Sequence, residues 1–117
     1  MLTDDEIYKV IPQSFVICNN KVEIILRDDI TIDDGEDRET RYGQWNEVLN
    51  TIELAKGVII GDDKEATPVN LEQIQNTFAH EVCHCFEFYS GMPYDEQRVQ
   101  LFANWFREYE TSKKFKK

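Results

Sequence analysis

Histidine occurs only twice in this sequence, and both residues belong to the segment His80-Glu81-Val82-Cys83-His84. In an α-helix, residues four positions apart lie one turn apart on the same face, so His80 and His84 can bind one metal ion together. Glu81 would then lie beside the open side of that ion. Zinc lowers the pKa of a bound water toward neutrality, and a neighbouring carboxylate can take the proton of this water as it attacks a carbonyl carbon. The segment therefore predicts a Zn²⁺ site for hydrolysis, with His80 and His84 as ligands and Glu81 as general base.

The surrounding residues predict the helix that this motif requires. Asn70 is a good N-cap with Gln73 at the capping-box position, and Gly91 followed by Pro93 is typical of a helix end. At about 100° per residue, an apolar stripe falls on the side away from the two histidines. The stripe consists of Leu71, Ile74, Phe78, Val82, Cys85, Phe86 and Tyr89. We therefore expect one face of this helix to join a core and the other to hold the metal ion.

A catalytic zinc ion commonly has three protein ligands and leaves its fourth position to water, so one more ligand must come from outside the motif. Glu96 is the best candidate, because it begins the next predicted helix, and an antiparallel return would bring its first turn alongside the metal. Asp95 is better suited to cap that helix, and Gln100 is a poor ligand for zinc. Glu87 points back beside His80 on the central helix, where it could support a ligand, but it is predicted to be a solvated carboxylate.

The first half of the chain predicts a short helix and a β-hairpin. Thr3 and Glu6 have the spacing of a capping box, and the helix that they begin is expected to end near Pro12. Residues 14–18 and 22–26 are β-branched, apolar runs separated by an asparagine-containing turn, which indicates a hairpin.

Three further segments complete the predicted sheet. Residues 28–41 are dominated by charge and have neither helical nor strand periodicity, so they are predicted to form an exposed loop. Residues 43–46 and 51–55 predict a second hairpin, in which Thr51 and Glu53 would lie on a wet face. Residues 57–61 fit either an extension of the sheet or a buried connector.

The last predicted helix follows Asp95 and completes a single domain over residues 1–117. Its core stripe is expected to consist of Val99, Phe102, Phe106 and Tyr109, widened by Leu101 and Trp105. The resulting fold is α+β, with a small, mostly antiparallel sheet packed against the motif helix and this C-terminal helix. Residues 112–117 are predicted to be a frayed, basic tail.

Composition narrows the classes of partner. The 117 residues include 13 basic and 23 acidic side chains, and a net charge of −10 argues against nucleic acid or an anionic membrane as the main partner. No apolar run is long enough to span a bilayer, and the acidic N-terminus is unlike a signal peptide, so we expect a cytoplasmic protein. Cys83 and Cys85 are expected to be reduced, buried side chains.

The order of these motifs resembles that of the ImmA/IrrE-type metallopeptidases and the small phage-encoded zinc proteins allied to them. The resemblance covers about residues 40–106 and rests on the His80–His84 motif, on the pattern Glu96-x-x-Val99-Gln100-x-Phe102-Ala103, and on the two strand segments before the helix. It implies a compact zincin-like core, in which His80, His84 and Glu96 bind zinc and Glu81 acts as general base. The chain departs from the family pattern at Cys83, Cys85 and Gln100.

These observations predict a zinc metallopeptidase that acts on a peptide or protein. The substrate would add to an edge strand, expected at residues 51–55, and Tyr42 or Tyr94 could stabilise the oxyanion, whereas Tyr89 belongs to the apolar stripe. The first alternative is a non-catalytic binding or regulatory protein that contains zinc. A second is a metal-free adaptor with a fortuitous motif. Glu81 favours the enzyme, because a structural site with four ligands has no use for a base.

Overall fold

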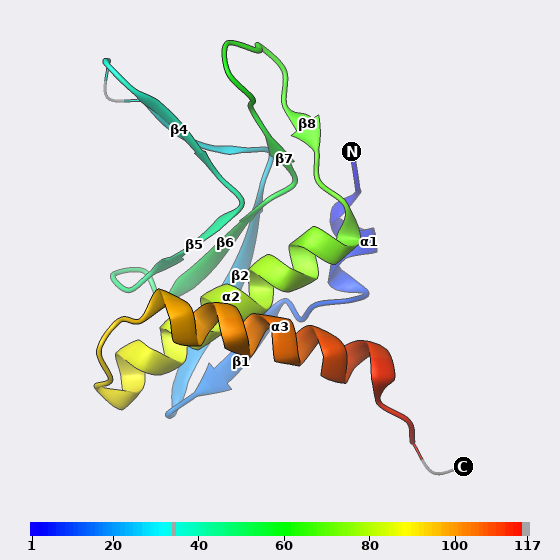
Figure 1. The fold of residues 1–117 in the computed structure, drawn as a ribbon, viewed down its shortest axis with the longest axis vertical. Coiled ribbons are helices and arrows are strands. Elements are labelled where there is room, and N and C mark those ends of the chain that lie inside the picture. Colours follow the sequence, from blue (N-terminus) through cyan, green and yellow to red (C-terminus); the bar gives the residue numbers. More distant parts are fainter. Residues whose placement is uncertain (34, 116–117) are drawn as a thin grey trace.

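The structure, a computed structural model, describes residues 1–33 and 35–115. Its elements are α1 (Asp4–Tyr8), β1 (Ser14–Ile17), β2 (Asn20–Arg27), β3 (Ile30–Asp33), β4 (Arg38–Arg41), β5 (Gly43–Asn46), β6 (Thr51–Ala55), β7 (Gly57–Val58), β8 (Thr67–Pro68), α2 (Leu71–Ser90) and α3 (Glu96–Ser112). Small, mostly antiparallel sheets precede two long C-terminal helices (Figure 1). This arrangement confirms the predicted α+β class.

The main sheet has the strand order β1-β2-β6-β5. The predicted hairpins β1–β2 and β5–β6 are both present, and β2 pairs with β6 in parallel. Cys18 and Asn19 form the first turn with positive φ angles of 48° and 65°. Since β6 lies between β2 and β5, the prediction that it is an edge strand is wrong.

The central position of β6 also removes its predicted wet face. Glu53 is only 7% exposed. Its carboxylate accepts hydrogen bonds from Arg27 Nε at 3.1 Å and from Gln44 Nε2 at 3.2 Å, one on each neighbouring strand. A charged residue can be buried here because both neighbours supply donors.

The segment predicted as a loop, residues 28–41, contains the antiparallel pair β3–β4. Asp33 faces Arg38 and Ile32 faces Glu39 across this pair, while Ile30 is buried. Asp33 and Arg38, two of the charged residues that suggested a loop, thus face each other across the strands, where opposite charges stabilise a sheet. Figure 1 shows this hairpin projecting from the body of the molecule. Residues 57–61 also contain a strand, β7, which pairs with β8 outside the main sheet.

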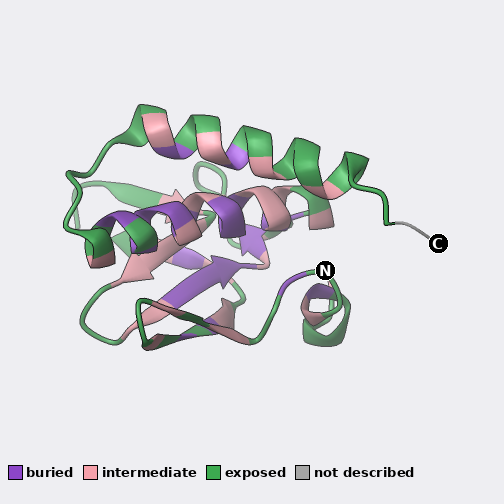
Figure 2. Ribbon diagram, turned by 90° about the horizontal axis from the view of Figure 1, so that it is seen from below, coloured by how far each residue is buried: buried purple, intermediate pink, exposed green. Residues whose placement is uncertain are grey.

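Helix α2 lies between the main sheet and α3 (Figures 1 and 2). The buried cluster beneath it is aliphatic for the most part and consists of Ile7, Ile11, Val22, Ile24, Ile52, Leu54, Val58, Val69, Ile74, Phe78 and Cys85. Most of the predicted α2 stripe belongs to this cluster or packs against it, but Phe86 is 48% exposed. On α3 the buried positions are Val99 and Ala103. The expectation that the core stripe includes Tyr109 and is widened by Leu101 and Trp105 is wrong, because all three are exposed.

The predicted helix caps are confirmed, but α1 ends at Tyr8 and not near Pro12 as predicted. Thr3 and Glu6 form a complete capping box, and the Asn70 side chain accepts the Gln73 N–H. Asp95 caps α3 by accepting the Arg98 N–H, and Gly91 ends α2 in the left-handed region with φ 69°. The short segment between these last two caps sets where α3 begins.

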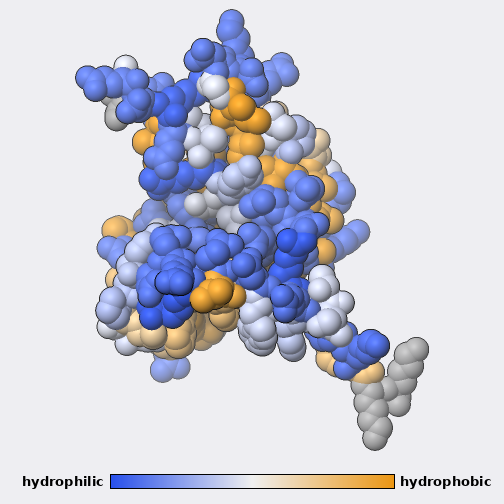
Figure 3. All heavy atoms as spheres, viewed as in Figure 1, coloured by the Kyte–Doolittle hydropathy of each residue, from blue (hydrophilic) through white to orange (hydrophobic). Residues whose placement is uncertain are grey.

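One face of the molecule is mostly polar. On the face shown in Figure 3, hydrophilic residues cover most of the molecule and hydrophobic residues form small separate patches. Beyond α3, Lys113 to Phe115 are exposed, and residues 116 and 117 of the predicted tail lie outside the described residues. No helix in the described part of the chain is long and apolar enough to cross a membrane.

Strand β5 packs closely against α2 at Gly43. A Cβ atom added there would lie 2.6 Å from Thr77 Cγ2 and 2.9 Å from the Glu53 carbonyl oxygen. We expect Gly43→Ala to lower the free energy of unfolding by about 1–3 kcal/mol, measured by urea denaturation. Adding Thr77→Ser, which removes the methyl group, should restore part of the loss. A Gly43→Ala variant as stable as the wild type would contradict this packing.

Candidate metal centre

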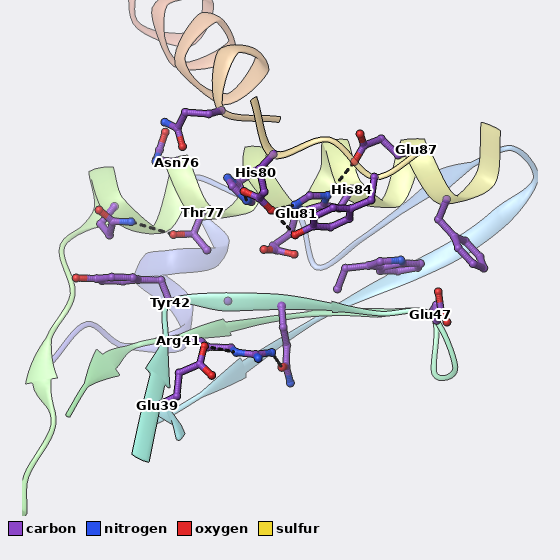
Figure 4. A pocket seen from close by; sticks show the side chains of 18 of the residues that line it. Glu39, Arg41, Tyr42, Glu47, Asn76, Thr77, His80, Glu81, His84 and Glu87 are labelled. Carbon is purple, nitrogen blue, oxygen red and sulfur yellow. Dashed lines mark hydrogen bonds and ion pairs between the residues drawn. The ribbon is translucent and has the colours of Figure 1, made fainter. Parts of the chain in front are cut away.

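His80 and His84 lie on the side of α2 that faces the start of α3 (Figure 4). Glu96, the first residue of α3, meets both: its Oε1 is 2.8 Å from His84 Nε2 and its Oε2 is 3.3 Å from His80 Nε2. One potential ligand atom from each of the three residues lies within 4.8 Å of the other two. The structure therefore brings together the three residues that were predicted as ligands.

These donors fit a zinc ion in kind and in spacing. Zinc in catalytic sites is commonly held by imidazole nitrogen and carboxylate oxygen at ~2.0–2.2 Å, which places tetrahedral ligands about 3.4 Å apart. The 3.3 Å between His80 Nε2 and Glu96 Oε2 is close to that value, whereas the 2.8 Å between His84 Nε2 and Glu96 Oε1 is a hydrogen-bond distance. His84 is 6% exposed, whereas the Glu96 side chain is 55% exposed. The cluster is thus anchored in the core on one side and open to solvent on the other.

Glu87 is the residue that sequence analysis placed wrongly. It is 2% exposed, and its Oε1 lies 2.9 Å from His84 Nδ1. Its Oε2 accepts a hydrogen bond of 3.1 Å from the Asp95 N–H and is also bound by the Arg98 guanidinium. Its position three residues after His84 was the available signal, since residues at that spacing share a helix face.

This position lets Glu87 orient a ligand. A histidine that binds metal through one ring nitrogen usually donates from the other to a carboxylate, which fixes the tautomer and the direction of the ring. Glu87 can accept from His84 Nδ1 and leave Nε2 toward Glu96. The carboxylate thereby links α2, the α2–α3 connection and α3 at the site.

Glu81 is buried next to this cluster and lines the same cleft. It is 8% exposed. The pKa of Glu81 is raised to about 7, chiefly by burial and also by the charge of Glu96, while the charges of His84 and Arg41 and a backbone hydrogen bond from Trp45 oppose the rise. In Figure 4 the carboxylate of Glu81 lies among the groups that face the cleft, beside the two imidazoles.

Of the three tyrosines considered for the oxyanion, Tyr94 is the one that contacts the candidate ligands His84 and Glu96. Its ring stacks on that of His84, with centroids 4.3 Å apart and planes 2° from parallel, and its hydroxyl donates to Glu96 Oε1. Tyr42 also lines the cleft, whereas Tyr89 is bound to Asn50 and does not. The hydrogen bond to Glu96 and burial raise the pKa of Tyr94 to about 12, so the phenol stays protonated.

The cleft has a volume of about 740 Å³ and lies between β5, the metal side of α2 and the start of α3. This volume is in the range of ligand-binding pockets. His80, Glu81, His84 and Glu96 all line it. A ligand in the cleft would therefore meet the candidate metal ligands and the adjacent carboxylate at once.

The other candidate ligands lie outside the cluster. Asp95 serves as the α3 cap, and the Gln100 side chain donates to Asn104. Cys83 and Cys85 are 6% and 0% exposed, as predicted for buried side chains. Burial raises the pKa of both thiols, that of Cys85 to about 12, which disfavours the thiolate form needed for metal binding.

Comparisons with protein-family models, curated protein sequences and solved structures found no match for this chain.

The hydrogen bonds of Glu87 predict that its removal destabilises the fold much more than removal of Glu72, another carboxylate of α2. Glu87→Ala should lower the free energy of unfolding by about 2–4 kcal/mol, because it leaves the buried His84 nitrogen and the Asp95 N–H without their acceptor. Glu72→Ala is the matched control, since Glu72 makes an exposed ion pair with Arg107 and should change stability by less than about 1 kcal/mol. Equal denaturation midpoints for the two variants would contradict the structural role of Glu87.

Proposed function

We propose that this protein is a zinc-dependent metallopeptidase. The observation that carries the proposal is the grouping of a buried carboxylate, Glu81, with a cluster of two histidines and a glutamate inside one open cleft. A structural zinc site is commonly closed by four protein ligands, whereas a catalytic site has three and leaves one position open. The three-residue cluster and its exposed side support the catalytic type. The resemblance to ImmA/IrrE-type metallopeptidases and the cytoplasmic location remain predictions.

In this proposal each residue of the site has a separate role in hydrolysis. A zinc ion held by His80, His84 and Glu96 would supply Lewis acidity for a carbonyl oxygen and for water. Glu81 takes the proton of the attacking water and returns it to the amine that leaves. Glu87 holds the His84 ring with Nε2 directed at the cluster. The Tyr94 hydroxyl, on Glu96 at the cleft, is the better placed of the two phenols for the developing oxyanion.

The substrate would pair with β5, which is the edge strand beside α2, and not with β6 as first expected. The Ala55 N–H donates to the Tyr42 carbonyl at 2.8 Å. Because hydrogen-bonded pairs alternate along an antiparallel ladder, the main-chain groups of Gly43 and Trp45 are directed to the open edge. The hydrogen bond from Trp45 to Glu81 places this edge beside the proposed base. An extended peptide that adds here would pass the metal cluster.

Glu81→Gln separates catalysis from metal binding. The amide cannot accept the proton of the attacking water, so cleavage of a peptide library by the zinc-loaded protein should fall at least about 100-fold, as expected for loss of a general base. Bound zinc, measured by elemental analysis, should stay as in the wild type. A wild-type protein that retains zinc but cleaves no peptide would favour the non-catalytic zinc protein instead.

Glu96→Ala tests the third ligand. Loss of its carboxylate should weaken zinc binding at least about 10-fold in a competition titration, because mutation even of an outer-shell partner commonly costs 10–100-fold. Glu39→Ala is the control, since Glu39 lines the same cleft but is paired with Arg41 and lies outside the cluster. Unchanged affinity in Glu96→Ala would remove Glu96 from the ligand set.

A further inference from the structure

The cleft has two unlike halves, one on each side of the histidines. Figure 4 shows Asn76, Thr77, Tyr42, Arg41 and Glu39 on one side and Glu47 on the other. The first half is therefore lined mainly by polar and charged side chains.

The second half is apolar apart from its rim. Phe88 lies one turn after His84 on α2, and Met92 follows the end of that helix; both line the cleft together with Trp45 of β5. The rings of Trp45 and Phe88 are 6.0 Å apart. This group of three side chains is called the apolar half-cleft below.

Two of the three side chains of the apolar half-cleft are exposed, and Trp45 is half-buried against the core. Phe88 is 47% exposed and Met92 is 38% exposed. Aromatic rings and a methionine side chain that line a concave site favour an apolar ligand, because burying them against it removes their surface from water. The Trp45 N–H is bonded to Glu81, and its main-chain carbonyl is directed to the open edge in the same part of the cleft. An extended peptide that pairs with this carbonyl on β5 would direct a side chain toward these rings.

The rim of this half is acidic. Glu47 is exposed and makes no ion pair among the described residues, whereas Glu39 at the opposite end is paired with Arg41. Arg41 is the one cationic side chain among the described residues that line the cleft. With a net charge of −10 on the whole chain, this rim attracts a basic side chain and repels an acidic one.

We propose that the apolar half-cleft and Glu47 form a specificity-determining subsite, which accepts a large apolar side chain of an extended peptide that carries a basic residue next to it. This inference rests on the proposed function for the cleavage step. The binding preference itself depends only on Trp45, Phe88, Met92 and Glu47.

Cleavage of a mixed peptide library by the zinc-loaded wild type provides the first test. We expect a large apolar residue at one fixed position beside the cleaved bond and a basic residue adjacent to it. Phe88→Ala should lower kcat/KM for such peptides about 10-fold, as does removal of comparable apolar contact from other enzyme pockets. Cleavage without an apolar preference would overturn the subsite.

Phe86→Ala is the matched control. Phe86 lies on the same helix and is 48% exposed, close to the 47% of Phe88, but it does not line the cleft. Its substitution should leave kcat/KM unchanged. Equal effects of the two substitutions would overturn the inference.

Glu47→Lys should raise KM about threefold for peptides with the basic residue without changing kcat, in keeping with an exposed charge pair.

A binding arm separates failure of the subsite from failure of the proposed function. The zinc-loaded Glu81→Gln variant, with and without Phe88→Ala, is applied to a peptide array. If the wild type cleaves nothing but the array shows an apolar and basic preference that Phe88→Ala abolishes, the peptidase proposal fails and the subsite stands. Cleavage that occurs with no such preference in either arm leaves the peptidase standing and rejects the subsite. Absence of both cleavage and binding rejects both.

Discussion

The buried carboxylate of Glu87 is the interaction on which the arrangement of the site depends. It accepts from His84 on its own helix, from the Asp95 N–H at the helix connection and from Arg98 on α3. Without an acceptor at this place, the desolvated Nδ1 and N–H groups would each cost about 1–3 kcal/mol. One side chain thereby holds the first turn of α3 beside the histidines, and Glu96 reaches them from there.

The second constraint is the position of α2 between two layers. Ile74, Phe78 and Cys85 face the main sheet, and α3 covers another side of the helix. His80 and His84 then occupy the strip between those two contacts, where the cleft opens. The close approach of Gly43 to Thr77 brings β5 to the same strip. The cluster of His80, His84 and Glu96 and an open strand edge therefore adjoin because of how one helix is packed.

Local sequence patterns were sufficient to predict the structural features that depend on residues close together in the chain. The caps at Thr3, Asn70 and Asp95, the left-handed Gly91 and the two main hairpins follow from short-range chemistry, and the structure has all of them. The grouping of His80, His84 and Glu96 also follows, because an antiparallel return after a tight connection leaves few residues within reach of the motif.

Features that depend on distant pairing were missed. The parallel alignment of β2 with β6 makes β6 central and buries Glu53, and no local pattern encodes which strands become neighbours. The charges of residues 28–41 hid a hairpin, since their cross-strand partners cannot be recognised before the register is known. Glu87 was predicted to be solvated because its other partners, Asp95 and Arg98, lie beyond the end of its own helix.

The most direct test of the metal centre is the X-ray absorption spectrum of the purified protein loaded with one equivalent of zinc. The account predicts one tightly bound ion per chain, with two imidazole ligands, the remaining ligands oxygen and no sulfur in the first shell. A zinc ion coordinated by sulfur, or a protein that binds no zinc at micromolar concentration, would contradict it.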